Sequence, residues 1–313
     1  MRFLVTGGAG FLGSALSNRL VGEGHEVRVI DNLTAGDPAR LSPKVLFERG
    51  DVADIPKLWT LLQDVNCVYH LAARVSVPES IKYPRDYNHV NVGGTVSVME
   101  AMRDAGVQRV VLASSGAVYG EQPEQPLSED MSPVPDSPYA VSKLSAEIYV
   151  RTIGKLWGIE TVALRIFNAY GPGQQLPASH APVVPRLLKA AQTGASLVIF
   201  GDGGHSRDFV YVDDIVEALA SAATAPNIDR QIINVGSGVE TTLDALVEAI
   251  QQVTGHHAEP LHNPGQQAGL RRMRADITRA RALLGFSPRV RLLDGLKLML
   301  ERDPRFAVAE SGK

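Results

Sequence analysis

The chain has 313 residues, which at roughly 150 residues per domain is enough for two lobes or one large domain. Hydrophobic residues make up 44% and charged residues 21%, and no apolar run approaches the roughly 18 residues of a membrane span, so the composition excludes a membrane protein. The net charge is -3 and the basic residues form no block, so we expect no nucleic-acid partner.

The cysteine content bears on compartment and chemistry. A single cysteine, Cys67, excludes an internal disulfide framework and a multi-cysteine zinc site. Its apolar surroundings predict an inert core residue rather than a nucleophile. Gly7 and Gly8 interrupt the first apolar run, so we expect no targeting peptide. These features favour a reducing, cytoplasmic location.

Short apolar runs alternate with longer amphipathic segments through the first half of the chain. The runs predict strands at 3–5, 27–30, 45–47, 67–71, 109–112 and 161–165. The intervening segments have helical spacing, most clearly at 11–22, 55–65, 92–105 and 139–157. This alternation predicts an α/β fold with a doubly wound parallel sheet and helices on both faces.

The pattern changes at a segment rich in Gly, Pro and Gln, residues 171–177. The half that follows is irregular, which predicts a smaller, mixed lobe after this boundary. Before the boundary, the acidic, Pro-rich segment 124–136 is expected to be a solvated surface loop.

Three glycines follow the first predicted strand and open the first predicted helix. Gly7, Gly10 and Gly13 form G-x-x-G-x-x-G, where bare backbone can approach a pyrophosphate at a helix N-terminus. Alone, the motif is equally consistent with a tight turn. Asp31, about 20 residues further on at the end of the second strand, is placed to bind an adenosine ribose. A carboxylate there repels a 2′-phosphate, so NAD is preferred over NADP.

Tyr139 and Lys143 stand one turn apart on a predicted helix, so their side chains share a face. An ammonium beside a phenol favours the phenolate, which could then act as a general base. A bare pair of this kind is more often a surface feature. Upstream, a strand ends in Ser114 and Ser115, and ligands bind at strand ends of this type in doubly wound folds.

These motifs resemble the extended short-chain dehydrogenase/reductases, and among them the NAD-dependent nucleotide-sugar epimerases and dehydratases. The resemblance covers nearly the whole chain, because further segments fit the same family: 50–52, 70–73, 91–95, 165–168 and 201–214. It implies a Rossmann domain that binds NAD, made of residues 1–168 and 212–236. The remaining residues, 169–211 and 237–313, are then the nucleotide-sugar-binding lobe.

The resemblance also implies roles for individual residues. The catalytic set is Ser115, Tyr139 and Lys143. The expected NAD site consists of Gly7, Gly10, Phe11, Leu12, Gly13, Asp31, Asn32, Asp51, Val52, Leu71, Ala72, Ala73, Asn91, Tyr139 and Lys143. The expected substrate site consists of Ser76, Ser115, Asn168, Phe200, Arg207, Arg271 and Met273.

In the family mechanism, Tyr139 removes the proton of a sugar hydroxyl while hydride passes from the same carbon to the nicotinamide. Lys143 tunes Tyr139 and holds the nicotinamide ribose, and Ser115 hydrogen-bonds the reacting oxygen. Family dehydratases and decarboxylases place an acidic residue within two positions of the catalytic Ser or Thr, whereas this chain has Gly116 and Ala117. The resemblance therefore favours epimerisation through a 4-keto sugar, first of all of UDP-glucose and UDP-galactose.

The sugar and the phosphate contacts stay open. Many family members carry an Arg for the diphosphate where this chain has Gln266, and Arg271 is the expected substitute. Met273 stands where family epimerases gate sugar size, and Met is flexible and intermediate in size. UDP-glucuronate and UDP-N-acetylglucosamine are therefore alternative substrates. A dinucleotide-binding regulator without turnover is the alternative from another functional class.

Two further expectations concern metals and partners. His256, His257 and His262 are clustered, but their spacing fits no common zinc pattern, so we expect no metal. Family members commonly pair through two helices per subunit, here 92–105 and 139–157, so the resemblance implies a homodimer.

Overall fold

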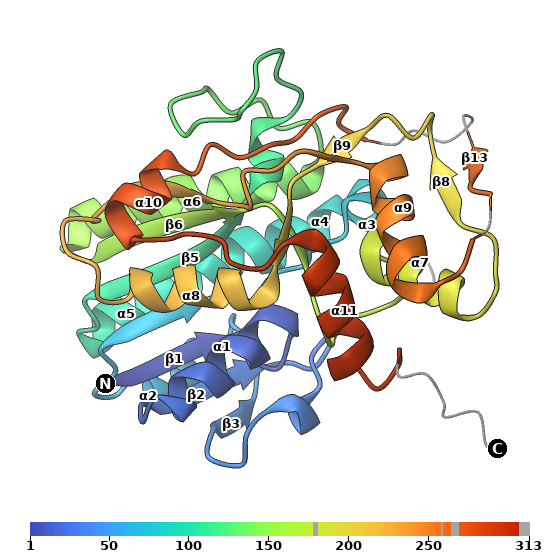
Figure 1. Ribbon diagram of the computed structural model, residues 1–313. Coiled ribbons are helices and arrows are strands. Elements are labelled where there is room, and N and C mark those ends of the chain that lie inside the picture. Colours follow the sequence, from blue (N-terminus) through green and yellow to red (C-terminus); the bar gives the residue numbers. More distant parts are fainter. Residues whose placement is uncertain (178–180, 258, 264–268, 307–313) are drawn as a thin grey trace.

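Figure 1 shows the computed structural model, which describes residues 1–177, 181–257, 259–263 and 269–306. At its centre is a seven-stranded parallel sheet in the order β11-β6-β5-β4-β1-β2-β3. The strands are β1 (Arg2–Thr6), β2 (Glu26–Asp31), β3 (Leu46–Arg49), β4 (Cys67–His70), β5 (Arg109–Ser115), β6 (Glu160–Ile166) and β11 (Gln231–Val235). The doubly wound parallel sheet and its six predicted strands are confirmed. The sequence-based expectation missed β11 as a strand.

The order of the strands locates a crevice at one edge of the sheet. The chain runs from β1 outward to β2 and β3 and then returns to β4 on the other side of β1. Ligands of doubly wound folds bind at the carboxyl ends of the strands where the order reverses in this way. Thr6 pairs with His70, so β1 and β4 end level with each other at this point.

Helices cover both faces of the sheet. α1 (Phe11–Gly22) and α8 (Val212–Ala222) lie on one face, and α2 (Ile55–Leu61), α5 (Gly94–Ala105) and α6 (Pro138–Trp157) lie on the other. Successive strand residues alternate between the two cores: Val5 packs with α1 and α8, whereas Leu4 packs with α2 and α5. Every helix in the described ranges is too short or too polar to cross a membrane.

Cys67 is a core residue, as its apolar strand predicts. It begins β4 and has no exposed surface. Burial raises the pKa of its thiol to about 12, so the reactive thiolate is suppressed at neutral pH.

The helix predicted over 92–105 has a longer and less regular start. α4 (Pro84–Tyr87) continues through a π-helical segment, Asn88–Gly93, into α5. π-Helical turns are rare and often occur at functional sites. This one contains Asn91, whose contacts are described below.

The smaller lobe lies beyond the carboxyl ends of the strands, towards the right of Figure 1. Its elements are α7 (Val183–Gln192), α9 (Leu243–Thr254), α11 (Leu292–Arg302) and three strand pairs: β7 (Asn168–Tyr170) with β10 (Phe209–Tyr211), β8 (Val198–Phe200) with β13 (Leu261–Asn263), and β9 (Ser206–Arg207) with β12 (Thr241–Thr242). α3 (Val77–Lys82) follows β4, and α10 (Thr278–Leu284) packs beside β11. Leu187 and Met299 share the core on the α1 and α8 face, so the two lobes have a continuous interior. Their division at the boundaries given above stays a proposal.

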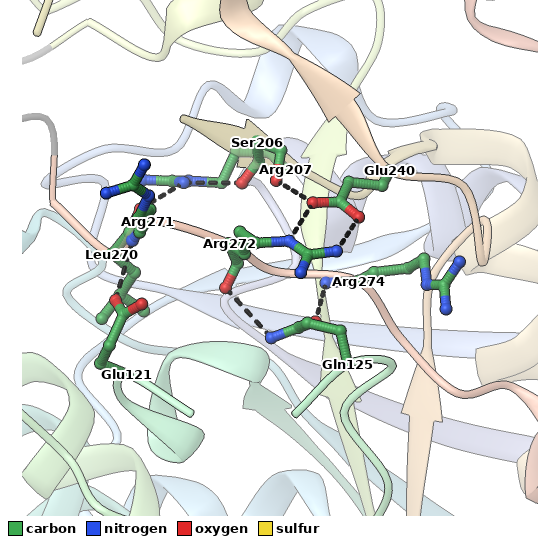
Figure 2. A network of polar contacts seen from close by, with 9 residues as sticks. All are labelled: Glu121, Gln125, Ser206, Arg207, Glu240, Leu270, Arg271, Arg272 and Arg274. Carbon is green, nitrogen blue, oxygen red and sulfur yellow. Dashed lines mark hydrogen bonds and ion pairs between the residues drawn. The ribbon is translucent and has the colours of Figure 1, made fainter. Parts of the chain in front are cut away.

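The segment 124–136 is not the free surface loop that its composition suggests. Leu127 is fully buried, its N–H donates to the Arg274 carbonyl (2.7 Å), and its carbonyl accepts from the Asp276 N–H (2.8 Å). The side chain of Gln125 accepts a further bond from the Arg274 N–H (2.9 Å; Figure 2). The segment therefore ties the sheet to the chain before α10, because each buried main-chain group needs a partner.

Candidate active site

Glycine shapes the turn after β1. Gly7 has a φ of +67°, and a Cβ there would lie 2.7 Å from the Cα of Ala72. A Cβ on Gly13 would collide with the carbonyl oxygen of Gly7. The turn can therefore approach β4 and a ligand closely only because these side chains are absent.

α1 begins directly after Gly10, with its N-terminus at the carboxyl edge of the sheet. Within the described part of the chain, no side chain caps this terminus, and its first turn holds no acidic residue. The N–H groups of a helix N-terminus and the helix dipole favour an anion. Gly10, Phe11, Leu12 and Gly13 therefore fit the pyrophosphate of a dinucleotide.

Asp31 ends β2 beside this turn. Its Oδ2 accepts a hydrogen bond from the Ala9 N–H (3.0 Å), and its Oδ1 accepts one from the Leu33 N–H (2.8 Å). A carboxylate has further lone pairs, so both oxygens can still accept from ribose hydroxyls. These bonds hold the carboxylate at the position where it is expected to discriminate against a 2′-phosphate.

The residues expected around the adenosine also contact one another. Asn32 donates from Nδ2 to Asp51 Oδ2 (2.9 Å), so these two side chains orient each other. Val52 is buried and its side chain lies against Gly94.

His70 ends β4 between two threonines. Thr95 donates its hydroxyl proton to the Asn91 carbonyl (2.6 Å), so its oxygen accepts from His70 Nε2 (2.9 Å). His70 Nδ1 then accepts from the Thr6 hydroxyl (2.7 Å), whose oxygen accepts from the Ala72 N–H (3.3 Å). Burial lowers the pKa of His70 to about 3, so the imidazole is neutral.

The three residues after His70 follow the edge of the crevice. Leu71 donates its N–H to the Thr6 carbonyl (3.1 Å). Leu71, Ala72 and Ala73 are all half-buried, and Ala72 lies against Gly7. Their main chain therefore borders the site predicted for NAD.

Asn91 has protein partners at both ends of its amide. Its Oδ1 accepts from the Arg74 N–H (2.8 Å), and its Nδ2 donates to the Arg74 carbonyl (3.0 Å) and to Ser142 Oγ (2.9 Å). Asn91 thereby joins the loop after β4 to α6. Its expected contact with NAD stays a prediction.

The proposed catalytic residues come from two elements that meet at the same edge. Ser115 ends β5, and the Ser137 hydroxyl caps α6. α6 begins at Pro138, whose fixed φ suits a helix start, so Tyr139 lies in the first turn and Lys143 follows on the same face. Tyr139 is 9% and Lys143 is 5% exposed.

Burial controls the titration of this pair. It raises the pKa of the Tyr139 phenol, and hydrogen bonding with Ser115 acts in the opposite direction. The sequence-based expectation was a lowered pKa, because an ammonium beside a phenol favours the phenolate. The net shift is in the other direction, because the enclosed ring has lost the water that would stabilise a phenolate. The Tyr87 ring, edge-on to Tyr139 at 6.4 Å and 87°, contributes to this enclosure. Burial also lowers the pKa of Lys143 to about 8, while the charge of Glu147 opposes that shift.

The sequence-based expectation missed Glu147, which is buried one helical turn after Lys143. Its carboxylate accepts hydrogen bonds from the Ser114 hydroxyl and from Arg165 Nε (3.0 Å) and Nη2 (2.8 Å). The available signal was spacing: Tyr139, Lys143 and Glu147 recur every four residues and so share one helix face.

Figure 2 shows Arg207 and Arg271, two residues of the expected substrate site, as neighbours. Arg207 Nη1 donates to the carbonyls of Ser206 (2.7 Å) and Leu270 (2.6 Å). The Arg271 N–H donates to Glu121 Oε2 (2.8 Å). Burial lowers the pKa of Arg207, and the charge of Glu121 opposes that shift.

The Arg272 guanidinium has an ion-pair partner, whereas the Arg271 guanidinium has none among the residues that the structure describes. Arg272 Nε and Nη2 donate to the Glu240 carboxylate at 2.7 Å each, and this pairing lowers the pKa of Glu240 to about 2. The two guanidinium groups point in different directions in Figure 2. Arg271 is therefore the better candidate for a ligand phosphate, while Gln266 lies outside the described residues.

Met273 lies at the catalytic end of the site. Its Cε is 3.2 Å from the position that a Cβ would take on Gly116, the residue after Ser115. The Phe167 ring borders the same position at 3.2 Å. The residue expected to gate sugar size thus borders the strand end that carries the proposed catalytic serine.

The other expected substrate residues have separate local roles. The Phe200 ring lies 5.1 Å from the Arg186 guanidinium. Ser76 caps α3 by accepting from the Glu79 N–H (3.2 Å). Asn168 begins β7, where its main chain pairs with β10.

His256, His257 and His262 are not gathered around a common point. His262 Nε2 bonds to Asp244 Oδ1 (2.9 Å). Among the residues that the structure describes, no three possible metal ligands come together.

The chain is similar to known proteins over nearly its full length. A family model for the NAD-dependent epimerase/dehydratase family matches residues 3–236. The chain is 41% identical over 308 residues to the UDP-glucose 4-epimerase of Mycolicibacterium smegmatis, with 96% of this chain and 98% of that protein covered.

Solved structures resemble the whole fold. The UDP-glucose 4-epimerase of Thermotoga maritima with UDP-glucose has a TM-score of 0.92 and 35% identity, covering 96% of this chain and 98% of that one. The UDP-N-acetylglucosamine 4-epimerase of Methanobrevibacter ruminantium in complex with UDP-N-acetylmuramic acid has a TM-score of 0.91 and 33% identity, covering 96% and 97%.

Proposed function

The chain belongs to the NAD-dependent epimerase/dehydratase family, and we propose that it interconverts UDP-glucose and UDP-galactose by inverting C4. The observation that carries this proposal is the end of β5, where Ser115 meets Tyr139 and is followed by Gly116 and Ala117. Dehydration needs a second acid or base, whereas epimerisation needs one base that returns its proton. The similarity to UDP-glucose 4-epimerases over 96% of the chain supports the same reaction.

The cofactor is NAD. The bare backbone of the glycine turn and the uncapped start of α1 fit its pyrophosphate, and the Asp31 carboxylate fits its adenosine ribose. Lys143 holds the nicotinamide ribose. When bound, NAD supplies the hydride acceptor and a positive nicotinamide charge that favours a phenolate.

Tyr139 acts as the base on the 4-hydroxyl of the sugar. Ser115 donates a hydrogen bond to the same oxygen and stabilises the charge that develops as the proton leaves. After the 4-keto sugar has turned over in the pocket, the hydride removed from C4 would return to the other face of that carbon, and Tyr139 returns the proton to the C4 oxygen. The cycle therefore ends with the base in its starting protonation state.

The choice of sugar depends on the space beside Gly116. Met273 borders Gly116, so its flexible side chain limits the space at the reacting end. UDP-N-acetylglucosamine and UDP-glucuronate are the second candidates, and a UDP-N-acetylglucosamine 4-epimerase is nearly as similar in structure. A non-catalytic dinucleotide-binding regulator is less favoured, because such a protein does not need Tyr139 and Lys143 buried together.

We also propose that the enzyme is a cytoplasmic homodimer that pairs through α5 and α6. The outer face of α6 carries four exposed apolar side chains, Val141, Ile148, Tyr149 and Leu156. A second copy would cover this face and hold the helix that carries Tyr139. Light scattering should give twice the chain mass of 33.6 kDa, and Ile148→Lys should reduce it to that of one chain.

Incubating the purified protein with UDP-glucose, UDP-galactose, UDP-N-acetylglucosamine and UDP-glucuronate tests the proposed reaction. Resolving the products by chromatography should reveal UDP-galactose formed from UDP-glucose, and the reverse, without added NADH or oxidant. If an epimer forms only from one of the other UDP-sugars, that sugar is the substrate instead of UDP-glucose. Bound NAD with no epimer from any sugar would favour the regulator.

A further inference from the structure

We infer that Glu147 is a positioning residue of the catalytic site: it holds the strand end that carries Ser115 against the helix that carries Tyr139 and Lys143. The inference rests on the proposed function for its effect on turnover. Glu147 lies on α6 one turn after Lys143 and two turns after Tyr139, and all three side chains are buried.

The partners of Glu147 are cross-strand neighbours in the sheet. Ser114 of β5 and Arg165 of β6 pair in register, and both donate to the Glu147 carboxylate. Ser114 is covalently joined to Ser115. One side chain on α6 therefore fixes the ends of two strands, and with them the distance from the Ser115 backbone to the helix.

Burying the Glu147 and Arg165 charges costs free energy unless each keeps its partner. Such a buried group therefore points to a positioning role for Glu147 rather than to stability alone. Ser114, Glu147 and Arg165 are each at most 4% exposed, and a buried ion pair often adds little to stability compared with apolar residues of the same size. Arg165 is enclosed further by the Tyr119 ring, 4.6 Å from its guanidinium carbon. Removing only the carboxylate charge would leave Arg165 buried without its counter-ion.

Glu147 also acts on the charge of Lys143. Two ionisable groups act on the charge of Lys143: Glu147 on the same helix and the neutral His70 of β4. Arg165 of β6 is paired with Glu147. Tyr139 lies one turn before Lys143 on α6. Since Arg165 is bonded to Glu147 and His70 is uncharged, Glu147 is the group among these that favours the protonated ammonium. Burial lowers the pKa of Lys143 to about 8, so this support matters near neutral pH.

Glu147→Gln tests the charge, because glutamine keeps the size and one acceptor oxygen. In the ligand-free protein, an NMR titration of the lysine side chains, with Lys143→Met to assign the signal, should place Lys143 at lower pH in Glu147→Gln than in the wild type. The turnover of UDP-sugar should fall on the order of 10- to 100-fold with a smaller change in KM, as expected for a displaced catalytic group. The alkaline limb of the pH profile of turnover should move to lower pH.

Two controls separate position, charge and folding. Ser114→Ala removes the strand contact but leaves the carboxylate, so turnover should fall while the Lys143 titration stays in place. Glu217→Gln removes a partly exposed, Arg-paired glutamate on α8 and should change neither measurement. An unchanged Lys143 titration in folded Glu147→Gln, or wild-type turnover in Ser114→Ala, would overturn the inference.

If Glu147→Gln does not fold, the same measurements on Ser114→Ala and on the more conservative Glu147→Asp test the inference. Because the lysine titration needs no substrate, it still tests the inference if every UDP-sugar proves inert.

Discussion

The main-chain N–H of Ala9 donates a 3.0 Å hydrogen bond to Asp31 Oδ2, so the glycine turn after β1 is bonded directly to the end of β2. The other carboxylate oxygen accepts from the Leu33 N–H at 2.8 Å. The residue that is proposed to choose between NAD and NADP therefore also shapes the turn that is proposed to bind the pyrophosphate.

Substitution of Asp31 should affect both roles. Asp31→Ala removes the ribose acceptor and the negative charge, so NAD affinity should fall about 10- to 100-fold and discrimination against NADP should weaken. It also leaves two main-chain N–H groups without their acceptor, which should lower the free energy of unfolding by about 1–3 kcal/mol. Titrations of the cofactor-free protein with NAD and NADP, with denaturant unfolding alongside, measure the two effects. Asp31→Asn retains an acceptor and should lose less stability. Wild-type protein that binds NADP as tightly as NAD would contradict the role of Asp31.

His70 should make the folded protein sensitive to acid. Burial lowers its pKa to about 3 in the folded chain, against the ordinary value of 6.5 in the unfolded chain. Between these values the unfolded chain binds a proton that the folded chain does not, so the free energy of unfolding should decrease as pH falls, by up to about 1.4 kcal/mol per pH unit. Denaturant unfolding between pH 7.5 and 4.5 measures this slope. His70→Gln should flatten it, whereas exposed His89→Gln should not. Equal slopes in His70→Gln and the wild type would exclude this explanation.

The sheet could be predicted because each strand of the first half carries its own local pattern. Apolar runs and amphipathic segments alternate from β1 to β6, and each crossover helix is encoded beside its strand. β11 has a similar apolar run, but its place beside β6 depends on the smaller-lobe segments that intervene in sequence. The path of 124–136 depends in the same way on contacts with residues near 275.

The catalytic residues could be proposed from the sequence because Tyr139 and Lys143 are one helical turn apart. The contact of Glu147 with Ser114 and Arg165 could not, since it requires the register between β5 and β6. The titration of Tyr139 also depends on the whole enclosed edge, including Tyr87, and local spacing conveys nothing about that burial.

Met273 should influence which sugar is accepted. Met273→Ala opens space next to Gly116, so the ratio of turnover with UDP-N-acetylglucosamine to turnover with UDP-glucose should rise. The substitution also removes a buried side chain and should cost about 2–5 kcal/mol of stability. Met273→Leu conserves volume and should leave the ratio near that of the wild type. Comparing kcat/KM for the two sugars in the three proteins measures the effect, and a ratio independent of residue 273 would show that the gate lies elsewhere.

Tyr139→Phe should separate chemistry from binding. The substitution keeps the ring against Tyr87 and removes only the phenol oxygen. NAD binding and the fold should therefore survive, while turnover should fall about 10²- to 10⁴-fold, the usual contribution of a positioned acid-base group. Ser115→Ala should cost less, because it removes one hydrogen bond to the reacting oxygen and leaves the base. Near wild-type turnover in Tyr139→Phe would remove Tyr139 as the base.

The pH dependence of Tyr139 should depend on whether NAD is bound. Burial raises the pKa of the phenol in the ligand-free chain, above its ordinary value of about 10. Turnover near neutral pH needs the phenolate, so the positive charge of the oxidised nicotinamide has to bring this pKa down. An absorbance titration of tyrosinate should therefore show a phenol that ionises at lower pH when NAD is added, and this change should be absent in Tyr139→Phe. Activity should fall as pH decreases through that lowered pKa, because the base becomes protonated. A tyrosinate titration that NAD leaves unchanged would mean that another group takes the proton.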